Sequence, residues 1–406
     1  MGGDVEKKLS ICITTYNRSK YLDCCLRSIY QQLISAGKIS LVNVIVSDNC
    51  STDLTSDVVL KYKNLLDLKY LVSQDNYGYE TNYGSSISMA SGEYSLYLSD
   101  DDLLDIESVF EIIDFMESNP SVSVVYAPWR LIDLTSGKDC GEFYHIEKLT
   151  AFEKASYEKV LNFVLDGHIF PEVGIYRNYS NKKIAFTVDG MAWCAFVQLR
   201  NALSVGDVVF WPNNFYAAVV NYFPDLAHGH EGSKDTMYKW DTYRGGVEAL
   251  LAAARVDPVW MSFYALKINK FTAIRMSVGL RLRLAAGVGC AVENYYLAAR
   301  VAAYGVGLPI CGKDISMMAR LEYIAKSRQI HNHRKGLYVV DCMNAALAEE
   351  LNKLNPCSWF VGSEEFDSIC PDDVVVLLMN NAKVCWRGGG NCYISEDDLE
   401  LMFPEI

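Results

Sequence analysis

The chain has 406 residues, of which 50% are hydrophobic and 21% charged, a composition that excludes collagen-like and intrinsically disordered proteins. Because a typical domain has roughly 100 to 200 residues, we expect more than one structural unit. The formal charge of −13 argues against a general nucleic-acid-binding protein, whose surface would be basic.

The first 130 residues alternate short apolar runs with stretches of helical spacing. This pattern predicts strands at residues 9–14, 41–46, 68–72, 94–98 and 121–127, with helices at 19–33, 52–66, 78–90 and 106–118 between them. Strands that alternate with helices indicate a mostly parallel sheet. We therefore expect an open α/β domain at the N-terminus.

The remainder of the chain is less regular at first and then strongly helical. We expect helices at 150–165 and 193–203, long helices over 247–330, and a small α/β unit with strands at 337–340, 358–361 and 374–379 around a helix at 344–354. The predicted domains are 1–245, with halves 1–130 and 131–245, then a helical region at 246–335 and a C-terminal unit at 336–406.

Charge is distributed unevenly along the chain. Residues 251–335 carry 13 Lys and Arg against four Asp and Glu, a net charge of +9, whereas the segments before and after are acidic. A basic region of this kind is either a solvated surface or a platform for an anionic membrane and a lipid-diphosphate acceptor. The first predicted strand of the C-terminal unit is followed by no glycines for a phosphate loop at residues 339–344, so we expect this unit to mediate dimerisation or lid packing.

Cysteine usage and the termini bear on the compartment. The chain has 13 Cys but no C-x-x-C pair, so neither a zinc ribbon nor a thioredoxin-type site is predicted, and a reducing compartment fits best. No secretory signal is predicted, and no segment has the roughly 20 apolar residues of a membrane-spanning helix. We expect a cytoplasmic protein, with peripheral contact at the inner face of the membrane as a further expectation.

Polar segments follow three of the predicted strands. They are residues 14–17 after the first strand, 47–53 after the second and 99–102 after the strand at 94–98. In open parallel sheets, ligands bind beyond the carboxyl ends of the strands, so these segments should converge on one crevice. Taken singly, each could instead be a helix cap or a solvated loop.

These segments carry a family resemblance. The runs S-I-C-I-T-T-Y-N-R at 10–18, V-S-D-N-C-S-T-D at 46–53 and G-E-Y-S-L-Y-L-S-D-D-D at 92–102, together with Asn82, resemble the nucleotide-sugar half of family 2 glycosyltransferases with the GT-A fold. The S-D-D-D sequence is similar to the abequosyltransferase-like branch that builds bacterial O-antigens and capsules. The resemblance is strong over about the first 130 residues and weaker to about residue 250.

The resemblance implies roles for individual residues. Asp100 would contact the ribose, Asp102 would bind a divalent metal, Asp101 would be a neighbour of open role, and Asp48 would hydrogen-bond the base. Lining the nucleotide pocket would be Thr14, Thr15, Tyr16, Asn17 and Asn82. The cofactor implied is Mn²⁺ or Mg²⁺, since hard cations prefer carboxylate oxygens and can neutralise a departing diphosphate.

Two further elements of the family pattern lie later in the chain. The run V-G-D-V-V-F at 205–210 and the H-G-H at 228–230 resemble the family's G-D-V strand and the His that follows it, which makes His230 a second candidate metal ligand. The family's general base, usually an Asp in an E-D pair, would fall at Ala195. Asp189 or Glu172 could serve instead, although either could equally be a cap or turn residue.

The sequence thus predicts a metal-dependent, inverting glycosyltransferase that moves a sugar from a nucleotide-diphosphate donor to a surface polysaccharide or lipid-linked glycan. Two alternatives remain. One is a nucleotidyltransferase, although residues 14–17 contain no glycine for a phosphate loop. The other is a nucleotide-sugar-binding scaffold without turnover, which the absent E-D acid would explain. The expected partners are the donor, a glycan or lipid-linked acceptor, an anionic membrane surface and a second copy of the chain through the C-terminal unit, with no nucleic acid.

Overall fold

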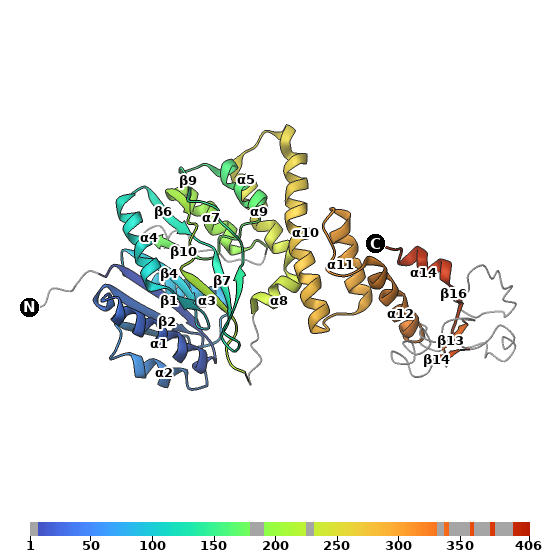
Figure 1. Cartoon of the computed structure of the whole chain (residues 1–406), viewed down its shortest axis with the longest axis horizontal. Coiled ribbons are helices and arrows are strands. Elements are labelled where there is room, and N and C mark those ends of the chain that lie inside the picture. Colours follow the sequence, from blue (N-terminus) through green and yellow to red (C-terminus); the bar gives the residue numbers. More distant parts are fainter. Residues whose placement is uncertain are drawn as a thin grey trace, which may run out of the picture. The chain divides into compact units, whose positions relative to one another are not determined.

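The computed structural model describes residues 7–178, 191–224, 231–330, 337–340, 358–360, 374–377 and 393–406. The chain divides into two compact units. Unit 1 comprises residues 1–231 and 239–271, and unit 2 comprises residues 232–238 and 272–406. Figure 1 shows the order of their elements. The three-part domain division expected from the sequence stays a prediction.

An eight-stranded sheet forms the centre of unit 1, in the order β3-β2-β1-β4-β10-β6-β11-β9. Neighbouring strands among β3, β2, β1 and β4 run parallel, whereas β10 is antiparallel to both β4 and β6. The strands are β1 (Leu9–Thr15), β2 (Val42–Asp48), β3 (Leu68–Val72), β4 (Tyr94–Ser99), β6 (Val122–Tyr126), β9 (Thr150–Phe152), β10 (Gly174–Arg177) and β11 (Asp207–Phe210). The expected α/β class is confirmed.

Helices cover both faces of the parallel half, which explains why its central strands are apolar throughout. Every residue of β1 and β2 is buried. Ile11 and Ile13 of β1 share a core with Leu22 of the helix that follows, while Cys12 packs on the opposite face with Ile87. Parallel strands buried on both faces lack the alternation of a half-exposed strand.

The helices of unit 1 follow the expected chain order. They are α1 (Ser19–Ser35), α2 (Thr55–Tyr62), α3 (Tyr79–Ser88), α4 (Ile106–Ser118), α5 (Tyr157–Gly167), α7 (Cys194–Val205) and α9 (Trp240–Ala254), with short 3-10 turns η1 (Ile39–Leu41) and η2 (Pro258–Trp260). A second sheet has the order β5-β12-β7-β8. Its strands are β5 (Leu103–Leu104), β7 (Trp129–Asp133), β8 (Lys138–Glu142) and β12 (Tyr216–Asn221).

One expected helix was wrong at its start. The helix predicted over 150–165 begins at Tyr157, and residues 150–152 instead form strand β9, which pairs antiparallel with β11. Ala155 lies between the two elements with a φ of 65°, a left-handed conformation that a helix cannot include. Pairing with a strand more than 50 residues away therefore overrode the local helical pattern.

Unit 2 is helical in its described part, with a small sheet. It contains α8 (Glu231–Tyr238), α11 (Ala291–Ala303), α12 (Gly312–Ile330) and α14 (Glu396–Met402), while α10 (Met261–Ala286) continues from unit 1 into unit 2. The strands β13 (Leu337–Val340), β14 (Ser358–Phe360), β15 (Val374–Leu377) and β16 (Tyr393–Ser395) pair in parallel. The helix expected at 344–354 lies outside the described residues.

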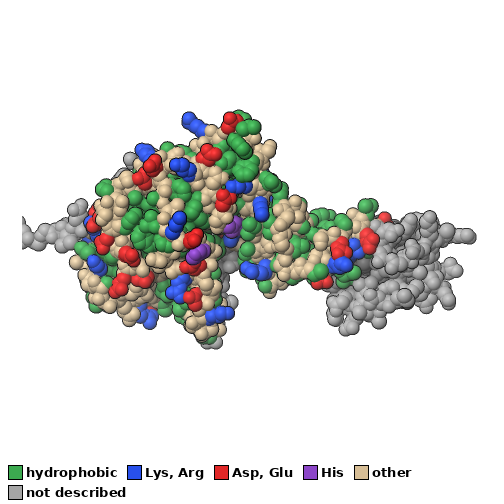
Figure 2. Space-filling view, turned by 45° about the horizontal axis from the view of Figure 1, so that its top comes forward, with side chains coloured by type: hydrophobic (Ala, Val, Ile, Leu, Met, Phe, Trp, Pro, Cys, Tyr) green, Lys and Arg blue, Asp and Glu red, His purple; other side chains and the backbone are tan. Residues whose placement is uncertain are grey.

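Two surface properties bear on function. On the face of unit 1 seen in Figure 2, acidic and basic side chains are interspersed, so the charge of −13 does not form a uniform field there. Among the helices that the structure describes, none combines the length and apolar character needed to cross a bilayer.

Candidate functional site

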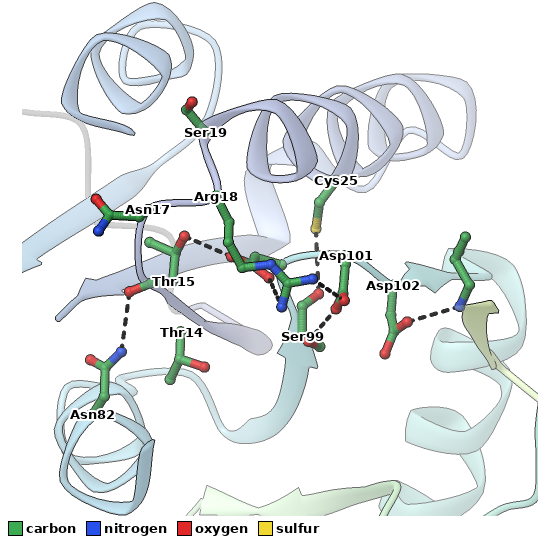
Figure 3. Close-up of polar contacts among 12 residues, drawn as sticks. Thr14, Thr15, Asn17, Arg18, Ser19, Cys25, Asn82, Ser99, Asp101 and Asp102 are labelled. Carbon is green, nitrogen blue, oxygen red and sulfur yellow. Dashed lines mark hydrogen bonds and ion pairs between the residues drawn. The ribbon is translucent and has the colours of Figure 1, made fainter. Parts of the chain in front are cut away.

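Strand register brings the polar segments together at one edge of the sheet. Thr15 of β1 lies beside Asp48 of β2, and Thr14 lies beside Ser99 of β4. Because these strands are parallel, the segments that follow them leave the sheet at the same edge. The structure thus places residues 14–18, 48–53 and 99–102 around a common region, and Figure 3 shows the first of these segments beside Ser99, Asp101 and Asp102.

The loops after β1 and β2 are bonded to each other. The Asn17 amide donates to Ser51 Oγ at 2.8 Å, and the Thr52 amide donates to Asn17 Oδ1 at 2.7 Å. Asn17 and Cys50 have φ values of 54° and 69°, an uncommon conformation for residues with a side chain. Such backbone conformations persist where surrounding contacts enforce them and cluster at functional sites.

Arg18 links two carboxylates of the acidic triplet. Its guanidinium forms an ion pair with Asp101, and its Nη1 lies 3.4 Å from Asp100 Oδ1. Thr15 Oγ1 also donates to Asp100 Oδ2 at 2.7 Å, and Ser99 Oγ donates to Asp101 at 2.5 Å. Figure 3 shows the Arg18 side chain reaching from the loop after β1 to Asp101.

Burial shapes the electrostatics of the triplet. Asp100 and Asp101 are only 2% and 5% exposed. Removal from water raises the pKa of Asp100 to about 7, and the nearby Arg18 charge opposes that rise. Burial also raises the pKa of Asp102 well above its usual range, and the Asp101 charge adds to the effect. Additional positive charge at this site would therefore stabilise the ionised triplet.

Asp102 is held differently from its two neighbours. Its Oδ2 accepts from the Tyr216 hydroxyl at 2.6 Å and its Oδ1 from the Val219 amide at 3.0 Å, both on β12. Figure 3 shows its carboxylate directed away from Arg18. Arg18 thus pairs with two of the three acids, and the third is fixed by the second sheet.

The other predicted pocket residues gather at the same edge. Asp48 accepts from the Tyr70 hydroxyl at 2.6 Å and from the Ser51 amide at 2.8 Å. Thr14 Oγ1 lies 2.9 Å from the Tyr97 hydroxyl, and Asn82 Nδ2 donates to the Thr15 carbonyl at 3.4 Å.

Two side chains at this edge remain available to a ligand. Tyr16 is 43% exposed. The buried Asn82 Oδ1 lacks a hydrogen-bond partner within the described part of the chain. An unfilled buried acceptor of this kind favours a donor supplied from outside.

The three acids differ in how well they fit a divalent cation. Within the described residues, no group of three or more His, Cys, Asp or Glu side chains is placed to hold a metal. Mg²⁺, however, is commonly bound by one or two carboxylates together with substrate phosphates and water. Asp102 is compatible with that arrangement, whereas Asp100 and Asp101 already pair with Arg18.

Of the three candidates for the general base and the second metal ligand, the structure describes one. Glu172, just before β10, accepts a hydrogen bond from the Trp193 indole at 2.7 Å, and its charge contributes to a raised pKa of Tyr144. Asp189 and His230 lie outside the described residues. Their roles stay predictions.

Sequence reasoning assigned no role to two residues that organise the site. Arg18 directly follows the T-T-Y-N segment. A basic residue at the end of one strand, with three acidic residues at the end of another, was the available sequence signal for an ion pair. No local signal in the sequence places Tyr216 2.6 Å from Asp102, because that contact depends on how β12 joins the second sheet.

Comparisons with known proteins find similarity to glycosyltransferases. Residues 10–182 match the family model described as Glycosyl transferase family 2. Abequosyltransferase RfbV of Salmonella typhimurium is 31% identical over 117 residues, which cover 28% of this chain and 34% of that protein. Poly(ribitol-phosphate) beta-N-acetylglucosaminyltransferase TarS of Staphylococcus aureus is 34% identical over 121 residues, covering 28% of this chain and 20% of TarS. The chain thus matches about a third or less of the length of these relatives.

Similarity to solved structures is broader but more distant. The S. aureus TarS 1–349 structure in complex with UDP has a TM-score of 0.49 and 16% identity, covering 78% of this chain and 84% of that one. Mannosyltransferase PcManGT from Pyrobaculum calidifontis, in complex with GDP-Man and Mn²⁺, has a TM-score of 0.46 and 15% identity, covering 74% and 80%.

Proposed function

We propose that the chain, whose residues 10–182 match the family model described as Glycosyl transferase family 2, transfers a sugar from a nucleotide-diphosphate donor to a growing surface glycan. One observation carries the proposal: residues 14–18, 48–53 and 99–102 meet at the carboxyl edge of parallel strands, tied by the Thr15–Asp100 and Asn17–Ser51 hydrogen bonds. Open α/β sheets bind ligands at that edge.

We assign the donor's nucleoside to the loops after β1 and β2. Asp48, held by Tyr70 and the Ser51 amide, keeps further lone pairs for a donor group on the base. Asp100 has a fixed orientation between Thr15 and Arg18 and accepts from a ribose hydroxyl. Thr14, Tyr16, Asn17 and Asn82 line this pocket.

The donor's diphosphate belongs near Asp102. A bound Mg²⁺ or Mn²⁺ would neutralise negative charge that develops on the departing diphosphate. Asp102 would hold that cation with one carboxylate, oriented by Tyr216 and the Val219 amide, and His230 remains the second candidate ligand. Arg18 keeps Asp100 and Asp101 paired, which leaves Asp102 as the carboxylate for the cation.

Transfer also requires a base for the acceptor hydroxyl. In an inverting reaction, a carboxylate removes that proton as the oxygen attacks the anomeric carbon and the nucleoside diphosphate leaves. Asp189 and Glu172 are the candidates. A Glu172→Gln variant preserves an acceptor for the Trp193 indole, so a fall in kcat of about 100-fold or more would assign the base to Glu172, and an unchanged kcat would leave Asp189.

The acceptor and its location follow from the same proposal. A growing O-antigen or capsule glycan on a lipid carrier places the reaction at the cytoplasmic face of a membrane. The net charge of residues 251–335 does not by itself provide a docking surface, because Arg275 and Arg283 are 7% and 4% exposed and Arg320 donates to the Phe403 carbonyl. Dimerisation through the C-terminal unit remains a separate proposal.

A thermal-shift panel of UDP, GDP, CDP and dTDP sugars, with and without Mn²⁺, tests the donor site. We expect one nucleotide class to raise Tm, with a larger shift when Mn²⁺ is present, because a ligand that binds only the native state stabilises it. Asp102→Asn should lose the Mn²⁺-dependent part. Asp139→Asn is the matched control, since Asp139 lies on the exposed strand β8 and pairs there with Arg130 of β7.

Different failures have different meanings. If no nucleotide sugar stabilises the protein, the proposed donor site is wrong. If a donor binds but no acceptor or water ever receives its sugar, the scaffold alternative is favoured. If Asp102→Asn responds to Mn²⁺ as wild type does, the metal assignment is wrong while the donor site stands.

A further inference from the structure

Large apolar side chains are exposed where η2 leads into α10. Val259, Trp260, Met261, Phe263 and Leu266 are 74%, 57%, 45%, 46% and 63% exposed, and we call these five residues the apolar edge. Near the top of Figure 2, the end at which α10 begins, hydrophobic side chains reach the surface. Contiguous exposed apolar surface is uncommon on soluble proteins and marks a contact site.

The apolar edge is not the outer part of the core. On the same helix, Tyr264, Ile268 and Phe271 are 3%, 2% and 2% exposed and belong to the main hydrophobic cluster of unit 1. The start of α10 therefore has two apolar faces, one packed inward and one in solvent. Packing of unit 1 explains only the first.

Specific contacts hold the apolar edge in place. Asp257 caps η2 by accepting from the Val259 amide at 2.9 Å. Two acidic residues of α5 hold the start of α10. Glu158 accepts from the Tyr264 hydroxyl at 2.9 Å, and Asp166 pairs with Lys267 at 2.7 Å. The exposed side chains thus project from a fixed helix start rather than from a loose loop.

The immediate surroundings of the apolar edge favour an anionic lipid surface. Arg255 precedes the edge and Lys270 follows it, and both are exposed, as is Asp257, so residues 255–270 carry a net charge of +2 from three basic side chains and one acidic one. Lys267 Nζ lies 4.9 Å from the centre of the Phe263 ring, so its aliphatic stem covers apolar surface. Trp, Phe and Leu beside Lys and Arg are the composition of interfacial membrane-binding helices.

We propose that the apolar edge inserts into the interfacial region of an anionic membrane and attaches unit 1 to it peripherally. The edge spans eight residues, or about 12 Å of helix. A stable dimer buries roughly 800 Å² per partner, and we expect five side chains over this length to offer less surface than that. A lipid surface has no such minimum, and insertion of a few aromatic and aliphatic side chains suffices.

This membrane-binding edge would provide the membrane contact that the proposed function requires, but its test does not depend on sugar transfer. Full-length protein is mixed with vesicles of phosphatidylcholine alone or with phosphatidylglycerol, and bound protein is measured by flotation. The test variant is Trp260→Ser/Leu266→Ser. The matched control is Leu54→Ser/Leu60→Ser, which removes two leucines that are 65% and 59% exposed at α2.

We expect wild type and control to bind anionic vesicles, roughly 30-fold more tightly than neutral ones if two basic side chains each contribute about 1 kcal/mol. The test variant should bind about 100-fold more weakly, because two large apolar side chains no longer leave water. All three proteins should have similar Tm values, since the replaced side chains are exposed.

Three results would overturn the inference. Wild type that fails to float with either vesicle excludes a lipid-binding edge. Equal flotation of test variant and control places membrane binding elsewhere. A concentration-dependent dimer in sedimentation experiments that only the test variant abolishes would instead identify the edge as an interface between two copies. None of these outcomes bears on donor binding, so the proposed function can fail or stand independently.

Discussion

Replacing Arg18 with Gln tests the charge arrangement of the site. The substitution removes a positive charge that pairs with both Asp100 and Asp101, and it leaves two carboxylates that are 2% and 5% exposed. A buried ion pair that loses one partner destabilises a protein by about 3–5 kcal/mol. Because the Arg18 side chain is itself 28% exposed, we expect a smaller loss of about 2–3 kcal/mol.

The loss should depend on pH in metal-free protein. Burial raises the pKa of Asp100 to about 7, against Arg18, which lowers it, so Arg18→Gln should raise that pKa further. A carboxyl with a raised pKa gains native-state stability as it takes up a proton. Arg18→Gln should therefore be closest to wild type near pH 5.5, where Asp100 is protonated in both proteins, and least stable relative to it near pH 8.5.

Thermal unfolding at the two pH values measures both effects. At about 2–4 °C per kcal/mol for a domain of 150–250 residues, Arg18→Gln should lower Tm by roughly 4–12 °C at pH 8.5. Arg130→Gln is the control, since Arg130 and Asp139 are 45% and 52% exposed and such pairs contribute about 0–1 kcal/mol. Equal Tm losses for the two variants, or a loss for Arg18→Gln that is larger at pH 5.5, would refute the reasoning.

Three further substitutions probe the scaffold of the site. Gly92→Ala should lower the free energy of unfolding by about 1–3 kcal/mol, because the new Cβ would lie 2.8 Å from the Leu9 carbonyl carbon and 2.9 Å from the Ser10 nitrogen. Gly84→Ala in α3 is the control and should be neutral or stabilising, because its Cβ would have nothing within 4 Å. Ser10→Ala should cost about 2 kcal/mol in denaturant unfolding, because the buried Ser10 Oγ accepts from the Gly92 amide at 2.9 Å and donates to Asn43 at 2.7 Å. Tyr216→Phe should cost about 1 kcal/mol and weaken Mn²⁺ binding in calorimetry, because Asp102 loses the hydroxyl that orients it; unchanged Mn²⁺ affinity would separate Tyr216 from the cation site.

The parallel half of the fold could be predicted because its information is local. The strand at 68–72 and the helix at 106–118 have the expected bounds, since each is a periodic segment between turn residues. Asp105 caps that helix by accepting from the Glu107 and Ser108 amides, a signal visible in the sequence. The convergence predicted for residues 14–17, 47–53 and 99–102 followed from parallel topology alone.

The remaining features depend on contacts between distant segments. Strand β9 forms because residues 150–152 pair with β11, and Asp102 is oriented by β12, more than 110 residues away. The different roles of Asp100 and Asp102 also required the structure, because three consecutive Asp residues are equivalent in a sequence. Arg18 separates them by pairing with Asp100 and Asp101.

The most direct test of the central claim is to identify the product released from the donor. Wild-type protein is incubated with the nucleotide sugar that stabilises it, Mn²⁺ and a lipid-linked glycan extract or water as acceptor, and the nucleotide product is followed by chromatography. The account predicts release of the nucleoside diphosphate, at least 100-fold slower in Asp102→Asn and unchanged in Asp139→Asn. Absence of nucleoside diphosphate, or release of a nucleoside monophosphate by cleavage between the phosphates, would contradict it.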